Sequence, residues 1–204
     1  MTRPTLPSLL QTGSAALLFA FAAALPAQAD DAAAVDSTLA QDTRAIAAGL
    51  VNQLGQKLKG AIANEGPLAA VSVCKEAAPA IAKDLSAQHG AQVTRVGTRV
   101  RNPKMGVPNA WQKEALAEFE ARLEKGEKPA DLEYWKVVDG SDGKRELRYA
   151  KAIVTQQLCV TCHGKPEDIP TPLLEKIRAE YPDDQATGYS VGKLRGAVVV
   201  TRPM

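Results

Sequence analysis

The sequence Cys159-Val160-Thr161-Cys162-His163-Gly164 holds two cysteines separated by two residues, with a histidine directly after the second cysteine. This spacing is the signature of c-type haem attachment. Each thiol adds to one vinyl group of the porphyrin, and one turn of chain then places the histidine under the iron as the proximal ligand. We therefore predict one covalent haem c, with Cys159 and Cys162 as its thioether anchors and His163 as an iron ligand.

The beginning of the chain has the composition of a secretory signal peptide. Arg3 gives it a positive start, residues 14–25 form an apolar run, and Ala27-Gln28-Ala29 has the small-x-small form of a cleavage site. The apolar run is shorter than the roughly 20 residues that span a bilayer, although an uncleaved anchor is an alternative. We expect a signal peptide over residues 1–29 and a periplasmic mature protein over residues 30–204, with no membrane attachment.

The charge of the mature chain is nearly balanced. Removing Arg3 from the 25 basic residues leaves 24 against 23 acidic ones, a formal charge of +1. This balance favours neither nucleic acid nor an anionic membrane surface as a partner. The length suits one domain, and a third cysteine, Cys74, is left over once two are attached to haem.

Two long helices are predicted in the first part of the mature chain. Apolar residues recur at spacings of four or seven over residues 36–63, which indicates one amphipathic helix. A second helix over residues 68–89 carries Cys74 on its apolar face, and Pro79 is expected to kink or restart it. The apolar stripe of the first helix has two candidate partners, the sheet or a second copy of the chain, so a homodimer through this helix is one expectation.

The rest of the chain alternates between strands and shorter helices. The predicted elements are a strand at 93–100, a helix at 109–125, a hairpin of strands 134–138 and 146–155, a helix at 171–180, and two short strands within 188–201 around Gly192-Lys193. Long helices followed by hairpins indicate an α+β domain with an antiparallel sheet.

Several short motifs occur in order along the chain. They are Cys74, Arg101-Asn102-Pro103, Asn109-Ala110-Trp111, Arg148-Tyr149-Ala150, the Cys159–Gly164 motif, Tyr181-Pro182-Asp183-Asp184, Gly188-Tyr189 and Leu194-Arg195-Gly196-Ala197. Together they resemble a family of single-haem c-type domains with a PAS-like fold, formerly a domain of unknown function, found alone or as sensory domains of signalling kinases. The likeness covers residues 68–201, with one departure at Ala152, where the family's proline is expected.

The resemblance implies a PAS-like antiparallel sheet with flanking helices, and it implies that Cys74 ligates the iron opposite His163. From the residues alone the sixth ligand stays open, because His89 and Met105 are also candidate donors. Met204 would reach the iron only if the tail folds back. Two alternatives use the cysteines without haem: a zinc site completed by Cys74, and a redox Cys-x-x-Cys pair.

Haem carboxylates require cationic partners. Arg99, Arg101 and Arg148 are the candidates, because a guanidinium group binds a carboxylate in a two-pronged geometry. Arg101 is the strongest of them, since it belongs to the matched Arg-Asn-Pro.

Two classes of function follow from these residues. The first is a non-enzymatic, exported monohaem cytochrome-like protein that transfers electrons or senses redox state with an unidentified redox partner. The alternative is a haem enzyme or gas sensor with an open sixth coordination site, such as a peroxidase. Peroxide chemistry requires a distal acid–base group, and His89 is the only histidine besides His163, so the first class is preferred.

Overall fold

The structure is a computed structural model, and it describes residues 35–140 and 143–204. The predicted signal peptide lies outside the described residues. The helices are α2 (Ser37–Glu65), α3 (Pro67–His89), α4 (Ala110–Glu124), α5 (Gln157–His163) and α6 (Thr171–Glu180), with short 3₁₀ turns η1 (Pro129–Asp131) and η2 (Pro166–Asp168). The strands are β1 (Gln92–Gly97), β2 (Glu133–Asp139), β3 (Arg145–Val154) and β4 (Leu194–Pro203). Within the described ranges, no helix has the length and apolar character required to cross a membrane.

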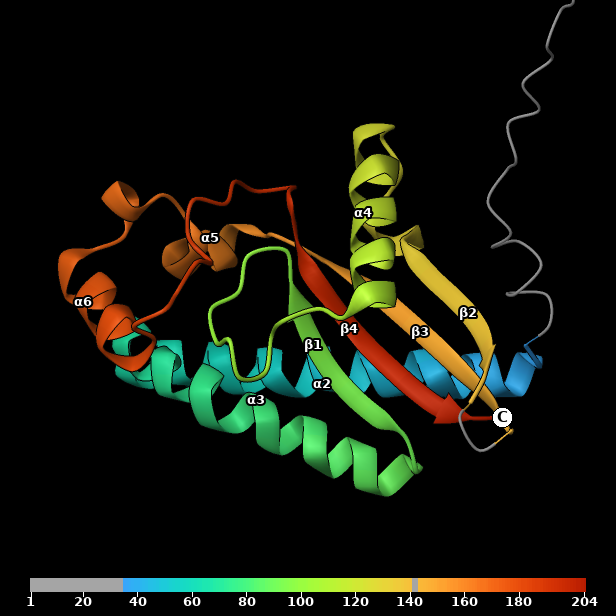
Figure 1. Ribbon diagram of the computed structural model, residues 1–204. Helices are drawn as coiled ribbons and strands as arrows, with labels where there is room; N and C mark the ends of the chain where they lie inside the picture. Colours follow the sequence, from blue (N-terminus) through green and yellow to red (C-terminus); the bar gives the residue numbers. More distant parts are fainter. Residues whose placement is uncertain (1–34, 141–142) are drawn as a thin grey trace, which may run out of the picture.

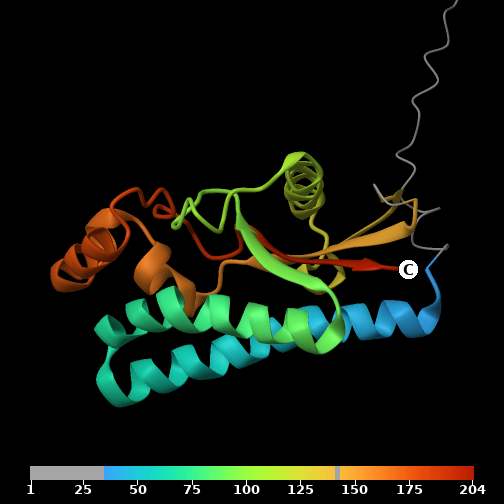
Figure 2. The same ribbon diagram turned by 60° about the horizontal axis from the view of Figure 1, so that its bottom comes forward.

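The four strands form one antiparallel sheet in the order β1-β4-β3-β2. The long helices α2 and α3 cover one face, and α4 crosses the other (Figure 1). The turned view shows these as three layers, with α5 and α6 beyond one end of the sheet (Figure 2). This arrangement confirms the predicted α+β class and the long N-terminal helix.

The first helix begins where the sequence predicts. The Asp36 carboxylate caps it by accepting hydrogen bonds from the backbone N–H groups of Thr38 and Leu39, at 2.8 and 3.2 Å. Such a cap satisfies donors that have no partner inside the helix. Gly66, with φ of 83°, then turns the chain into α3, a backbone angle that favours glycine.

The predicted restart of the helix at Pro79 is wrong, because α3 continues from Pro67 to His89 without interruption. The predicted kink there stays a prediction. Proline removes one helical hydrogen bond, to the carbonyl of Lys75, and costs about 3 kcal/mol in a helix interior. Packing offsets this cost, since Ala78, Ile81 and Leu85 are buried on the face that meets α2 and the sheet. Each large apolar side chain so buried contributes about 1.5–3 kcal/mol.

The predicted pair of strands within 188–201 is also wrong. Only β4 is present there, and residues 185–193 form a loop. The backbone N–H groups of this loop pair away from the sheet: Gly188 donates to the carbonyl of Gly164 at 2.7 Å, and Tyr189 donates to that of His163 at 2.8 Å. The Gly192 N–H donates to the carbonyl of Thr155 at 2.8 Å. These partners draw the loop over the end of α5 instead of beside β4.

Three apolar clusters hold the layers together. The first joins α2 and α3 to one sheet face, and the second joins α4 to the opposite face. The third lies at the end of the sheet, where Val71 of α3 packs with Ile169, Leu173, Ile177 and Tyr181 from η2–α6 and the segment that follows. Cys162 of the Cys-x-x-Cys-His motif packs against this third cluster, so α3, α5 and α6 meet there.

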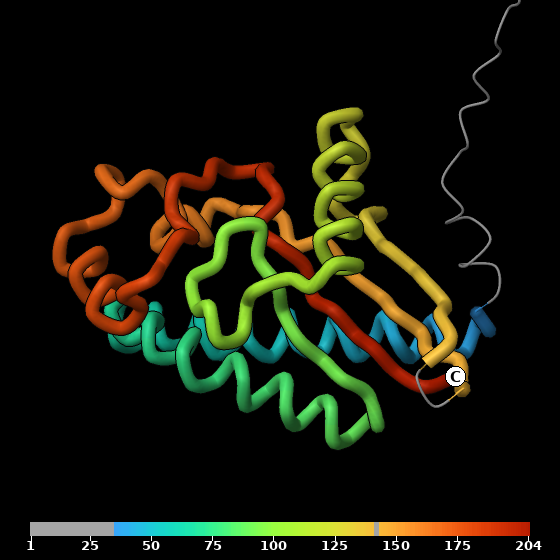
Figure 3. Tube along the Cα trace, in the orientation of Figure 1, coloured from blue at the N-terminus to red at the C-terminus, as the bar shows by residue number. Residues whose placement is uncertain are grey.

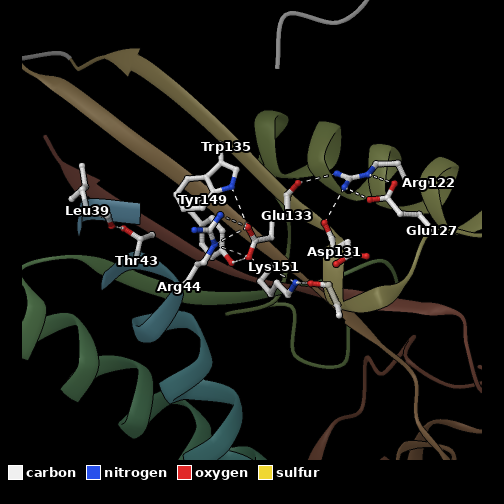
Figure 4. A network of polar contacts seen from close by, with 11 residues as sticks. Leu39, Thr43, Arg44, Arg122, Glu127, Asp131, Glu133, Trp135, Tyr149 and Lys151 are labelled. Carbon is white, nitrogen blue, oxygen red and sulfur yellow. Dashed lines mark hydrogen bonds and ion pairs between the residues drawn. The ribbon is translucent and has the colours of Figure 1, made fainter. Parts of the chain in front are cut away.

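A network of polar contacts around Glu133 ties α2 to the hairpin (Figure 4). The Glu133 carboxylate accepts hydrogen bonds from Arg44 Nε at 2.9 and 3.1 Å, from the Tyr149 hydroxyl at 3.0 Å and from Trp135 Nε1 at 3.3 Å. The Arg44 guanidinium also lies 4.9 Å from the centre of the Trp135 ring. One carboxylate therefore joins the N-terminal helix to two strands.

Replacing Glu133 by glutamine is expected to lower the free energy of unfolding by about 1–2 kcal/mol, because charge-assisted bonds are lost while Arg44 stays partly solvated. Urea denaturation measures this. Glu114→Gln is the control: its side chain is 59% exposed and pairs only with Lys136 among the contacts of the described residues, so a change below about 0.5 kcal/mol is expected. Equal effects of the two variants would contradict the role of Glu133.

Candidate functional site

The Cys-x-x-Cys-His motif forms the short helix α5 and the glycine that ends it. Cys159 and Cys162 are both free thiols and partly buried, and the Cys159 Sγ accepts a hydrogen bond from the Gln156 N–H at 3.3 Å. A Cβ at Gly164 would lie 2.4 Å from the carbonyl oxygen of Val160, far inside contact distance. Only glycine fits there, and it lets the chain leave the helix directly after His163.

The imidazole of His163 is held in one tautomer. Its Nδ1 lies 2.7 Å from the carbonyl oxygen of Ala186, and because a carbonyl only accepts, Nδ1 must carry the proton. Burial lowers the pKa of His163 well below its ordinary value, and the charges of Arg101 and Arg195 lower it further. The ring is therefore neutral at pH 7, with the lone pair of Nε2 free to bind a metal.

An ion pair fixes the carbonyl that orients His163. Arg101 Nη2 lies 3.0 Å from Asp184 Oδ2, and these side chains are only 12% and 7% exposed. The other oxygen of Asp184 accepts from the Ala186 N–H at 2.7 Å. The same Nη2 donates to the carbonyl of Cys162 at 2.7 Å and lies 3.4 Å from that of Ala186. The pair thus clamps the end of α5 to residues 184–186.

Tyr189 packs beside the histidine. Its ring is buried and meets the His163 ring edge-on, with ring centres 6.3 Å apart. Its hydroxyl lies 2.8 Å from Thr98 Oγ1 and accepts from the Arg99 N–H at 3.0 Å. The loop after β1 and the loop before β4 therefore run side by side past α5, as the trace shows (Figure 3). The Gln185 N–H also joins them, because it donates to the carbonyl of Val100 at 2.8 Å.

The third cysteine, Cys74, lies on α3 and faces this site. Burial raises the pKa of its thiol, while the charges of Arg95, Arg101 and Arg195 oppose that shift. Cys74 also acts on Cys162, whose thiol pKa is raised mainly by burial and further by Cys74 and Cys159. Thus α3 brings Cys74 within electrostatic reach of the motif, at the corner where Val71 and Cys162 share a cluster.

One other candidate donor, His89, lies apart from this corner. His89 is 15 residues beyond Cys74 on the same helix, which at 1.5 Å per residue places the two about 22 Å apart. His89 instead lies 3.8 Å from Asp42. Met105 and Met204 are 47% and 42% exposed. Among residues 35–140 and 143–204, no three His, Cys, Asp or Glu side chains are arranged to hold a metal ion, so these residues do not assemble the zinc alternative.

The three arginines predicted as carboxylate partners lie in different places. Arg101 is at the centre of the site. Arg99 is exposed at its rim, stacks 4.2 Å from the centre of the Tyr189 ring and donates to the carbonyl of Gly188 at 3.1 Å. Arg148 is not brought together with them: it pairs with Glu146 at 2.8 Å and lies 5.6 Å from the Trp111 ring, on the face that α4 covers.

Four side chains of the site were not assigned a role from the sequence. Three of them, Asp184, Tyr189 and Arg195, belong to the motifs that carry the family resemblance, but the sequence gives them no individual role. The fourth, Arg95, belongs to none of those motifs. Arg95 lies on the same face of β1 as Val93, toward α3, whereas Val96 is buried on the opposite face. A strand that buries both faces gives no period-two signal, so an inward-facing arginine could not be recognised.

Comparisons with known proteins point to one family. The profile of the Tll0287-like family (Tll0287) matches residues 23–203. The crystal structure of the cyanobacterial haem protein Tll0287 is similar with a TM-score of 0.60 and 25% identity, covering 83% of this chain and 98% of that chain. Comparison with curated protein sequences gives no match. The family resemblance inferred from the motifs is thereby confirmed.

The burial of neutral His163 predicts a pH-dependent stability of the haem-free protein. The folded pKa is lowered and the unfolded value is about 6.5, so the unfolded chain binds more protons below that pH. The free energy of unfolding should therefore fall as the pH drops below about 6.5, by up to about 1.4 kcal/mol per pH unit. Urea denaturation at pH 7 and pH 5 measures the slope.

In that experiment His163→Gln should remove this contribution, and His89→Gln, at the far end of α3, should retain it. A slope that survives in His163→Gln would show that the imidazole is not the group responsible.

Proposed function

This chain belongs to the Tll0287-like family, and from that membership we propose that it is an exported monohaem protein that carries electrons or senses redox state. Its structural relative Tll0287 is a cyanobacterial haem protein. The proposed cofactor is one haem c attached through Cys159 and Cys162. The proposed role is non-catalytic, in the periplasm, with a redox protein as partner.

The observation that carries this proposal is the state of His163. A partly buried, neutral imidazole donates Nδ1–H to the Ala186 carbonyl and keeps the Nε2 lone pair available. This hydrogen bond is the usual device that orients a metal-ligating histidine and strengthens it as a donor. Two free thiols stand one and four residues before it, which is the spacing that thioether attachment requires.

The polar atoms around the site also suit haem. Arg101 Nε and Arg195 Nε are buried and have no hydrogen-bond partner among the described residues. Buried donors without partners are rare in folded proteins, and haem carries carboxylates that accept from guanidinium groups. When bound, the haem supplies a one-electron couple of its iron, while the protein supplies the ligands, their orientation and the surrounding charge.

Cys74 is the proposed sixth ligand. It lies on the helix that packs at the α3–α5–α6 corner, whereas His89 is about 22 Å away along the same helix. A peroxidase-like alternative depends on a distal acid–base group, and this distance separates His89 from that role as well. We therefore favour electron transfer or redox sensing over catalysis.

A sensing role has a physical route through α3. Thiolate ligation would favour the ferric state because the sulfur would donate negative charge to the metal, so reduction would weaken the hold on Cys74. The residue after Cys74 is Lys75, which pairs with Glu180 of α6 at 2.5 Å. Release of the sulfur would therefore leave α3 tied to α6 by this exposed ion pair and by the apolar packing around Val71.

Covalent attachment is tested by intact mass. After periplasmic expression with the cytochrome maturation system, the protein should begin near Asp30 and carry one haem mass. Cys159→Ala with Cys162→Ala should lose the covalent adduct, whereas Cys74→Ala should keep it. A wild-type protein without the adduct would refute c-type attachment.

The sixth ligand is tested by the spectrum of Cys74→Ala. The wild-type ferric protein should give a low-spin EPR signal of the His–thiolate type, and the variant should become high-spin or water-ligated with a raised midpoint potential. Met105→Leu and His89→Gln are the matched controls and should keep the wild-type signal. An unchanged spectrum in Cys74→Ala would exclude this residue.

A further inference from the structure

Three arginine side chains surround the site that contains Cys74 and His163. Arg95 projects from the face of β1 that also carries Val93, toward α3. Arg101 follows β1 and contacts the end of α5 at the carbonyl of Cys162. Arg195, near the start of β4, lies 5.2 Å from the centre of the Tyr189 ring and donates to the Arg99 carbonyl at 3.0 Å. All three act electrostatically on both Cys74 and His163.

The protein neutralises only part of this charge. Asp184 pairs with Arg101 at 3.0 Å. Glu180 is already shared between Lys75 and Lys176, at 2.5 and 2.8 Å. Within residues 35–140 and 143–204, neither Arg95 nor Arg195 forms an ion pair with a carboxylate. Three guanidinium charges against one carboxylate leave two positive charges, and a charge that is even partly buried without a counter-ion is costly.

The backbone makes room for one of these groups. A Cβ at Gly97 would lie 2.7 Å from Arg195 Nη1 and 2.7 Å from the carbonyl oxygen of Arg99. Glycine at this position therefore lets the Arg195 guanidinium settle against β1. The Nε of Arg195, like that of Arg101, is buried and has no hydrogen-bond partner among the described residues. The Arg195 guanidinium is therefore held in place with one donor unused.

We propose that Arg95 and Arg195, together with Arg101, form the cradle that binds the two carboxylates of the haem. The two unbalanced charges of the cradle equal the two carboxylates that this cofactor brings. The inference rests on the proposed haem function and deepens it, because it assigns the carboxylates to arginines on β1 and β4. It leaves Arg148, on the opposite face of the sheet, without such a role.

The test uses the full-length chain with Cys159→Ala and Cys162→Ala, so that porphyrins bind reversibly. The probes are hemin and hemin dimethyl ester, in which both carboxylates are methylated. Arg95→Gln and Arg195→Gln should each weaken hemin binding about 10-fold or more, as expected for lost charge-assisted bonds. Binding of the dimethyl ester should change less than about 3-fold. Arg148→Gln is the matched control and should change neither.

Equal weakening for both probes would show a structural role for the arginines and overturn the proposal, as would no weakening at all. Gly97→Ala is a supporting variant, because its Cβ would displace the Arg195 guanidinium as well as the Arg99 carbonyl, and it should weaken binding of hemin more than binding of the dimethyl ester. Failure of the proposed iron ligands can be told apart from failure of the arginine cradle. If the ligands were wrong, His163→Gln and Cys74→Ala would leave the spectrum of bound hemin unchanged.

A second measurement decides the case if the thioether-free chain binds neither probe. In the matured protein, loss of Arg95 or Arg195 should raise the pKa of a bound carboxylate into the accessible range. The midpoint potential of these variants should then gain a pH dependence between pH 5 and 8 that Arg148→Gln lacks. Potentials with the same pH dependence in all variants would overturn the proposal.

Discussion

The hydrogen bond from His163 Nδ1 to the carbonyl of Ala186 is the contact on which the site depends. It decides which ring nitrogen keeps its lone pair, and it requires a backbone carbonyl at a fixed position beyond the end of α5. The Asp184–Arg101 ion pair fixes that carbonyl, because Asp184 accepts from the Ala186 N–H while Arg101 donates to the Cys162 carbonyl at the end of α5. The same requirement explains why residues 185–193 form a loop, since their N–H groups are committed to His163, Gly164 and Thr155.

The long helices connect this site to the rest of the molecule. One part of α3 meets α5 and α6 around Val71 and Cys162, and its buried face also joins α2 and the sheet. The Glu133 network then fastens α2 to the hairpin through Arg44. Cys74 therefore lies on one of two packed helices rather than on a loop, and in the proposed sensory role a change in its position would act on that pair of helices. This rigidity is what a sensory role would exploit, because packed helices shift as units.

The sequence revealed the parts of the structure that have a repeating pattern or a short chemical signature. The helices at Ser37–Glu65 and Ala110–Glu124 were predictable from their apolar spacing. The Cys-x-x-Cys-His motif was equally easy to recognise. The predicted restart of the helix at Pro79 was wrong, because a local cost of about 3 kcal/mol was weighed without the tertiary packing that offsets it. Arg95 was not found, since a strand buried on both faces carries no alternation, and the loop over α5 depends on contacts between residues distant in sequence.

The effect of burial on Cys74 bears on why three arginines gather here. If they served mainly to hold a thiolate, their charges should outweigh burial, yet the pKa of the Cys74 thiol is raised and burial is the larger cause. Guanidinium groups acting from a distance are thus insufficient to deprotonate this sulfur. Direct coordination to a metal cation would do so, because the positive charge of the metal would then be one bond away from the sulfur. The arginines therefore require another counter-ion, and carboxylates of the cofactor are the group that the site is proposed to receive.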